Sequence, residues 1–141
     1  MRFYENLDHI RENREPQRAY YIPETGCTLL NGIWDFQFYQ ADFEERIAPQ
    51  EWKKIDVPSC WQARGFENPN YTNVNYPFPF DPPYVPAKNP MGVYRREFQV
   101  ENTQREHYLV FEGVSSCLEL FVNGKYVGYS QRCPKTRRCP H

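Results

Sequence analysis

The stretch CLELFVNGKYVGYSQ, residues 117–131, is typical of a β-hairpin. Apolar and aromatic residues flank Asn123-Gly124, the dipeptide that favours a two-residue type I′ turn, because both central residues of that turn need a positive φ. The pattern therefore predicts two antiparallel strands, Cys117–Val122 and Lys125–Tyr129, joined by this turn.

A second alternating pattern lies upstream, in LNGIWDFQFY, Leu30–Tyr39. The rings of Trp34, Phe36 and Phe38 alternate with polar residues, which predicts a half-buried strand with its rings in the core. Strands at this spacing with turn signals between them are typical of an all-β sandwich. Further strands are expected at Lys54–Pro58, Val93–Val100 and Tyr108–Glu112. Arg96 falls on the inward face of its strand, where an ion pair is the simplest partner.

Composition limits the function classes. The chain has 141 residues, 25% of them charged, and a formal net charge of -1. This balance gives no electrostatic reason to expect a nucleic-acid or membrane partner. No apolar run has the length of a secretory signal or a membrane helix. The five cysteines have no metal-ligand spacing, which favours free thiols. A cytoplasmic protein is expected, with the periplasm as the alternative.

Motifs for catalysis and metal binding are absent from the sequence. It contains no phosphate-binding glycine loop, nucleophile elbow or HExxH pair. The acid pairs Glu44-Glu45 and Glu67 with Asp81 are expected by chance among eighteen acids, and we interpret them as solvated surface residues. His107 is expected to be a surface residue at a strand end. We therefore predict no catalytic residue and no metal site in this chain.

The segment YTNVNYPFPFDPPYVPAKNP, residues 71–90, combines six of the thirteen prolines with five aromatic side chains. Proline fixes its own φ and keeps the preceding residue extended, so the segment is predicted to be a stiff loop. A stiff loop can hold a polar group in a binding site at a small ordering cost. The polar groups available are Asn68, Asn70, Asn73 and Asn75, whose amides suit a sugar hydroxyl. Local Asx-turns are the other interpretation.

These stretches, together with VPSCWQARGF and FEGVSSCLELFVNGKYVGYSQ, resemble the N-terminal sugar-binding domain of family 2 glycoside hydrolases. The likeness is strongest to the bacterial β-galactosidase branch and runs from Asn13 to about Gln131. The combination of YTNVNYP, PPYVP, NP-x-G-x-Y and VNG-x-x-VGYSQ is specific, because an unrelated sandwich would not reproduce all four in order. The resemblance implies a jelly-roll-type β-sandwich, similar to galactose-binding domains and here incomplete.

The resemblance also implies a function. Family members hydrolyse terminal β-galactosides with retention, using two glutamates on a separate barrel domain. The proline-rich loop is expected to reach toward that barrel, and Asn73 to contact the galactose. Magnesium and sodium are implied for the complete, homo-oligomeric enzyme, with no cofactor in this chain. The implied partners are the sugar and the other domains, so the chain alone is expected to be inactive.

Two features depart from the family pattern. Cys60 replaces the asparagine that usually precedes the tryptophan, and we interpret it as a tolerated small buried residue, with a reactive thiol as the alternative. The final residues, RCPKTRRCPH, share no family pattern and resemble out-of-frame translation or a cloning junction; a short basic tail for nucleic acid is a weaker interpretation. The expected division is an irregular arm at 1–26, a partial sugar-binding sandwich at 27–131 and a disordered tail at 132–141.

Two other functions stay open at this point: a free-standing carbohydrate-binding module, and the functionless product of a truncated gene. The last predicted strand is expected to leave an open sheet edge. Aromatic residues that lose cover would then favour self-association.

Overall fold

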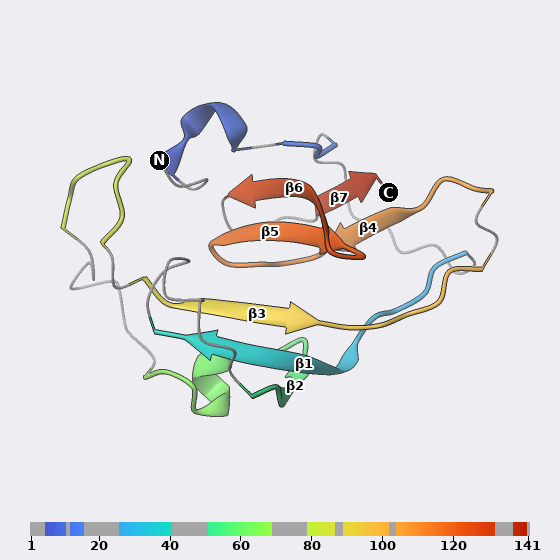
Figure 1. The fold of residues 1–141 in the computed structure, drawn as a ribbon, viewed down its shortest axis with the longest axis horizontal. Helices are drawn as coiled ribbons and strands as arrows, with labels where there is room; N and C mark the ends of the chain where they lie inside the picture. Colours follow the sequence, from blue (N-terminus) through green and yellow to red (C-terminus); the bar gives the residue numbers. More distant parts are fainter. Residues whose placement is uncertain are drawn as a thin grey trace. The chain divides into compact units, whose positions relative to one another are not determined.

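The computed structural model describes residues 5–10, 12–15, 26–40, 51–68, 79–86, 89–101, 104–131 and the backbone of 137–140. These residues form strands and short 3-10 turns, which confirms the all-β class expected for a β-sandwich domain. The chain groups into two compact units, Thr28–Gln99 and Met1–Cys27 with Val100–His141. Each unit contains its own strands (Figure 1). The predicted division into arm, domain and tail stays a prediction.

The Thr28–Gln99 unit contains a three-stranded antiparallel sheet. Its strands are β1 (Gly32–Tyr39), β2 (Lys53–Val57) and β3 (Met91–Arg95), with β1 in the centre. The strands predicted around Trp34 and at residues 54–58 are confirmed. β3 begins before the predicted Val93 and ends at Arg95 instead of continuing to Val100.

The aromatic rings of β1 form the core face of this sheet, as the alternation predicts. Phe36 is fully buried, and Ile55 on β2 is 2% exposed. The Phe36 ring packs on Phe66 and Tyr94, with centroids 4.7 Å away in each case. Trp34 is half-buried and donates its indole N–H to the Leu30 carbonyl at 2.7 Å. Ring packing therefore provides most of the core of this unit.

Charged residues cover the other face of the same sheet. Asp35 is bonded to Lys54 and, at 3.2 Å, to Arg95, its cross-strand neighbours on β2 and β3. Hydrogen bonds from Lys54 and then Arg95 lower the pKa of the Asp35 carboxyl. Arg95 also lies over the Trp52 ring, 4.1 Å from its centroid. Charge pairs and the contact of Arg95 with the Trp52 ring therefore hold this part of the outer face together.

For Arg96 an ion pair was predicted, and the structure shows a different contact. Its guanidinium donates to the backbone carbonyl of Ile33 at 2.8 Å. Because β3 has already ended at Arg95, the Arg96 side chain can extend to the start of β1 and bind a carbonyl there. The same guanidinium would lie 3.4 Å from a Cβ on Gly32.

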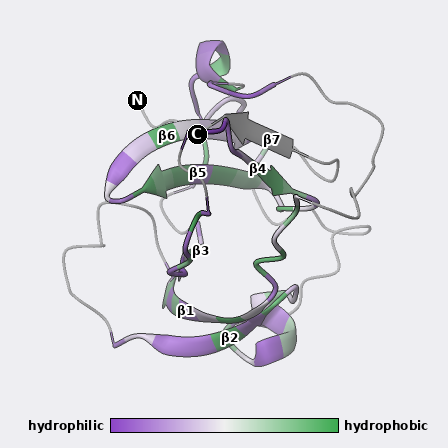
Figure 2. Cartoon of the chain, turned by 90° about the vertical axis from the view of Figure 1, so that its right-hand side faces the viewer, coloured by the Kyte–Doolittle hydropathy of each residue, from purple (hydrophilic) through white to green (hydrophobic). Residues whose placement is uncertain are grey.

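The second unit contains the predicted hairpin. Strands β5 (Cys117–Val122) and β6 (Lys125–Gln131) pair antiparallel. Asn123 and Gly124 have φ values of 51° and 76°, the positive values that the type I′ turn needs. Figure 2 shows that β5 is mostly hydrophobic, whereas β2 in the other unit is mostly hydrophilic.

The C-terminal segment differs from the predicted disordered tail. Arg137–Pro140 forms strand β7, which pairs antiparallel with β4 (Tyr108–Phe111). Backbone pairing needs no particular side chains, so a free strand edge can accept a segment that lacks an alternating pattern. The prediction of disorder is wrong for these four residues.

The N-terminal arm covers the edge of β6 that was expected to be open. After a 3-10 turn, η2 (Leu7–His9), the carbonyls of Ile10 and Glu12 accept hydrogen bonds at 3.4 Å from the amides of Gln131 and Tyr129. An added Cβ on Gly128 would lie 2.7 Å from the Glu12 carbonyl oxygen. The open edge is thus a wrong prediction at this position, because the arm supplies backbone acceptors.

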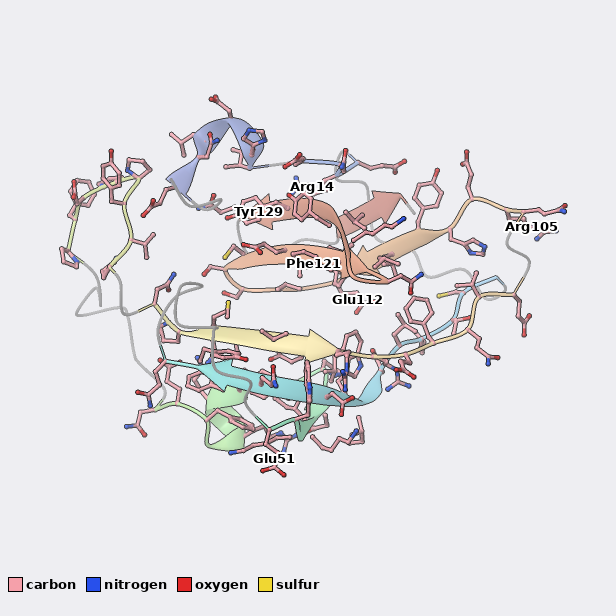
Figure 3. The ribbon with its side chains drawn as sticks, in the orientation of Figure 1. Arg14, Glu51, Arg105, Glu112, Phe121 and Tyr129 are labelled. Carbon is pink, nitrogen blue, oxygen red and sulfur yellow. The ribbon has the colours of Figure 1, made fainter. Side chains whose placement is uncertain are left out.

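Side chains strengthen the contact between the arm and β6. Asn13 donates to the Val127 carbonyl at 2.7 Å, and Arg14 donates to the Ser130 hydroxyl at 3.0 Å. Tyr126 donates to the Glu12 carboxylate at 3.0 Å. Figure 3 shows Arg14 and, on β6, Tyr129. The arm is therefore an ordered part of this unit at the residues described.

Candidate functional site

The candidate site is the proline-rich loop, residues 71–90, of which the structure describes residues 79–86 and 89–90 together with the segments that flank the loop on both sides. Asn73, the predicted sugar-binding residue, lies outside the described residues together with Asn70 and Asn75. Asn68 is described and exposed. The described residues therefore show how the loop is held.

The first end of the loop begins at the 3-10 turn η4 (Trp61–Arg64), which follows β2. Gly65 ends this turn with a φ of 78°, a left-handed conformation that favours glycine. Backbone amides of Gly65 and Phe66 donate to the Gln62 and Trp61 carbonyls, both at 3.1 Å. This tight turn brings the Phe66 ring back onto Phe36 in β1.

A carboxylate closes the same turn. The Glu67 Oε2 atom accepts hydrogen bonds from the Trp61 indole at 2.9 Å and from the Gln62 amide at 3.1 Å. Glu67 is half-buried, so its interpretation as a solvated surface acid is wrong. The signal that sequence reasoning missed is Trp61 itself, because a buried indole N–H needs an acceptor.

After the loop the chain enters β3 at Met91, and Gly92 is the second residue of that strand. A Cβ added to Gly92 would lie 2.7 Å from ring carbons of both Phe36 and Trp61. The Trp61 ring itself packs against Phe38, with centroids 5.7 Å apart. Gly92 and Trp61 are distant in sequence, yet their atoms meet on the core face of β1. These rings form an aromatic cluster of Phe36, Phe38, Trp61 and Phe66. The cluster contacts the chain on both sides of the loop.

Between these ends, residues 79–86 present aromatic rings to solvent. Phe80 is 93% exposed and Tyr84 is 60% exposed. The Tyr84 amide donates to the Asp81 carbonyl at 2.8 Å, which closes a turn around two prolines. Asp81 is exposed, so its surface interpretation is confirmed. The Glu44-Glu45 pair lies outside the described residues, and His107, directly before β4, is half-buried.

Cys60, at the start of η4, is exposed, and its interpretation as a buried residue is wrong. It occupies the position before the first helical residue, where its side chain makes no capping bond. Burial, and to a smaller extent an electrostatic interaction with Cys60, raise the pKa of the Tyr94 hydroxyl. The described cysteines Cys27, Cys60 and Cys117 are free thiols, as predicted.

A cavity of about 190 Å³ lies beside the first loop end. Lys53 lies over the Phe66 ring there, 5.5 Å from the centroid. Pockets for small molecules usually measure about 300–1,000 Å³, so this cavity is small for a sugar site. Its lining includes Gln37, Phe38, Glu51, Lys53, Gly65 and Phe66; Glu51 is labelled in Figure 3.

Among the residues that the structure describes, no three histidine, cysteine, aspartate or glutamate side chains gather as metal ligands would. None of the described helical turns has the length and apolarity that crossing a bilayer requires.

These features define an all-β domain whose aromatic cluster holds a long, proline-rich loop at both ends. Residues 27–137 match the family model "Glycosyl hydrolases family 2, sugar binding domain", and the chain belongs to this family. The match continues past Gln131, where the family resemblance was expected to end.

Curated relatives agree with the family match. The chain is 41% identical to a β-galactosidase of Actinobacillus pleuropneumoniae, over 92% of this chain and 14% of that protein. It is 46% identical to a β-galactosidase of Alteromonas mediterranea, over 91% of this chain and 13% of the relative. A β-galactosidase of Kluyveromyces lactis is 40% identical, over 89% of this chain and 14% of the relative. The chain thus spans about 14% of the length of the Actinobacillus relative.

Proposed function

We propose that this chain is the sugar-binding part of a glycoside hydrolase that cleaves terminal β-galactosides. The observation that carries the proposal is the family match over residues 27–137, together with relatives named β-galactosidase at about 40% identity. Retaining hydrolysis needs two carboxyl groups about 5–5.5 Å apart on the two sides of the scissile bond. In this proposal the remaining length of the enzyme supplies them.

Asn73 is the residue through which this chain contacts the sugar. Its amide donates to a galactose hydroxyl, and the loop that carries it is anchored at Trp61 and Gly92. An anchored loop loses little freedom on binding, so more of the hydrogen-bond energy contributes to affinity. The catalytic barrel is the partner toward which this loop faces, within a homo-oligomeric enzyme.

Magnesium and sodium belong to the rest of the enzyme in this proposal. The described residues contain no group of acidic, histidine or cysteine side chains that fits a metal ion. The contribution of the chain is to bind and orient the galactoside.

The test is turnover of a chromogenic galactoside by two purified proteins. The 141-residue chain alone is expected to be inactive, because it lacks the barrel carboxylates. A hybrid in which residues 27–131 replace the matching segment of the Actinobacillus relative is expected to be active, since the two are 41% identical. Turnover by the chain alone, with host enzyme excluded, would contradict the proposal, as would an inactive but correctly folded hybrid.

One observation favours a second function, a free-standing carbohydrate-binding module. Phe80 and Tyr84 are exposed on the loop, and exposed rings can stack on sugars. Titration of the chain with galactose and lactose separates the two functions. Millimolar or tighter binding that is lost in Phe80→Ala would favour the module, and no detectable binding would favour the enzyme part.

A further inference from the structure

Glu67 makes two hydrogen bonds through a single carboxylate oxygen. Oε2 accepts from the indole N–H of Trp61 at 2.9 Å and from the side-chain amide of Gln62 at 3.1 Å. Both donors lie in η4, and all three residues are half-buried. Hydrogen bonds to a charged acceptor are stronger than neutral ones, so this contact fixes the direction of the indole.

The indole that Glu67 holds is the meeting point of the two loop ends. The Trp61 ring packs on Phe38 and Phe36, with centroids 5.7 Å and 6.4 Å away. The backbone of Gly92 lies directly against the same ring. A rotation of the indole would therefore disturb the start of β3 as well as the turn at Phe66.

Proline limits the direction in which the chain continues directly after Glu67. Pro69 follows two residues later and favours an extended backbone at the preceding Asn68. The direction set at the turn is therefore passed on to Pro69, four residues before Asn73.

We propose that Glu67 is a positioning residue, whose carboxylate orients Trp61 and thereby sets where the proline-rich loop leaves the sheet. Its effect on sugar binding rests on the function proposed for Asn73. Its effect on the loop base, the turn at residues 61–68, does not depend on that function. The two effects can therefore be measured separately.

Hydrogen exchange of the purified chain, followed by mass spectrometry, tests the effect on the loop base. Glu67→Ala is expected to raise exchange in a peptide covering residues 61–68 by about tenfold, because it removes both hydrogen bonds that close the turn and one charged bond alone is worth about that factor. Glu67→Gln is expected to restore slow exchange, because its amide oxygen can still accept from Trp61. Glu97→Ala removes an exposed carboxylate of the same unit and is the matched control.

A double-mutant cycle separates the contact from general destabilisation. Trp61→Phe keeps a packed ring but removes the indole donor. If Glu67 acts through Trp61, combining Glu67→Ala with Trp61→Phe adds little to either change alone. Fully additive effects would overturn the proposal, as would equal acceleration in Glu67→Ala of a peptide from β2.

The hybrid enzyme tests the effect on the sugar. Glu67→Ala is expected to raise KM about tenfold with little change in kcat, and to have no further effect in an Asn73→Ala background. If Asn73→Ala leaves KM unchanged while exchange at the loop base responds as expected, the positioning of the loop stands and the proposed sugar contact fails. An unchanged KM in Glu67→Ala, beside a raised KM in Asn73→Ala, would overturn the link between Glu67 and the sugar.

Discussion

Single residues determine how closely the backbone approaches the aromatic cluster. At Gly92 any side chain would meet Phe36 and Trp61, whereas Gly113 has no atom within 4 Å of an added Cβ. Neither glycine has the positive φ that would make a substitution strained by itself. A comparison of the two positions therefore isolates the steric requirement for glycine at Gly92.

Gly92→Ala is expected to destabilise the chain by about 1–3 kcal/mol, because the added methyl group overpacks the cluster. Urea unfolding followed by tryptophan fluorescence measures this change. Gly113→Ala is the control and is expected to leave the free energy of unfolding within about 0.5 kcal/mol of that of the unmodified chain. Equal midpoints for the two variants would show that the ring contact at Gly92 relaxes freely.

At the scale of elements, the arm and β6 form a contact that resembles an added strand. Backbone bonds join Ile10 and Glu12 to β6, and Tyr126 donates to the Glu12 carboxylate. Burial, followed by the bond and charge of Glu12, raises the pKa of the Tyr126 hydroxyl, which donates to that carboxylate. Gly128 allows this approach because it has no side chain to meet the Glu12 carbonyl.

Gly128→Ala is expected to release the arm from β6. Amide exchange at Tyr129 and Gln131, measured by NMR, should then rise between about twofold and tenfold, the worth of one ordinary hydrogen bond at each amide. The Phe36 amide in β1 reports on the other unit and should not respond. Unchanged exchange at Tyr129 and Gln131 would show that the arm does not protect this edge.

Patterns that lie within one element could be predicted from the sequence. The Asn123-Gly124 turn and the Trp34, Phe36 and Phe38 alternation depend on neighbouring residues, and both are confirmed. The pairing of Ile10 and Glu12 with β6 joins segments more than a hundred residues apart, and nothing local in the arm signals it. Gly128 inside a predicted strand was the available signal, since such a glycine often marks a close backbone approach.

The candidate site was predictable to a smaller extent. The loop and Asn73 come from a family resemblance, and Asn73 lies outside the described residues. The bonds that hold the loop base depend on side chains folding back over a tight turn. The charge of Glu67 therefore suggested a surface role. In the structure its carboxylate instead accepts hydrogen bonds from Trp61 and Gln62, which the turn brings within reach.

At the scale of the whole molecule, few of the large apolar residues that the structure describes are buried. In the described residues only four hydrophobic side chains are buried: Phe36, Tyr39, Ile55 and Tyr129. Many others are exposed, including Ile33, Phe98, Val110 and Phe121. Phe121 and Tyr126 pair ring to edge on the hairpin but remain open to solvent. Such exposed apolar surface favours association with other protein surfaces.

The purified chain is therefore expected to be marginally stable and to self-associate. Sedimentation velocity should show oligomers whose share grows with concentration, and thermal unfolding should be broad. A concentration-independent monomer with a cooperative transition above about 60 °C, near the upper end for ordinary domains, would show this expectation to be wrong.

The central claim, that this chain supplies the sugar contact of a galactosidase, is tested most directly by the steady-state kinetics of Asn73→Ala in the hybrid enzyme. The loss of one donor to a galactose hydroxyl is expected to weaken substrate binding by about 1–3 kcal/mol. Gln99→Ala, which removes an exposed amide of the same unit, is the matched control and should change nothing. A raised KM in Asn73→Ala alone is the predicted result, and kinetics equal to those of the unmodified hybrid would contradict the account.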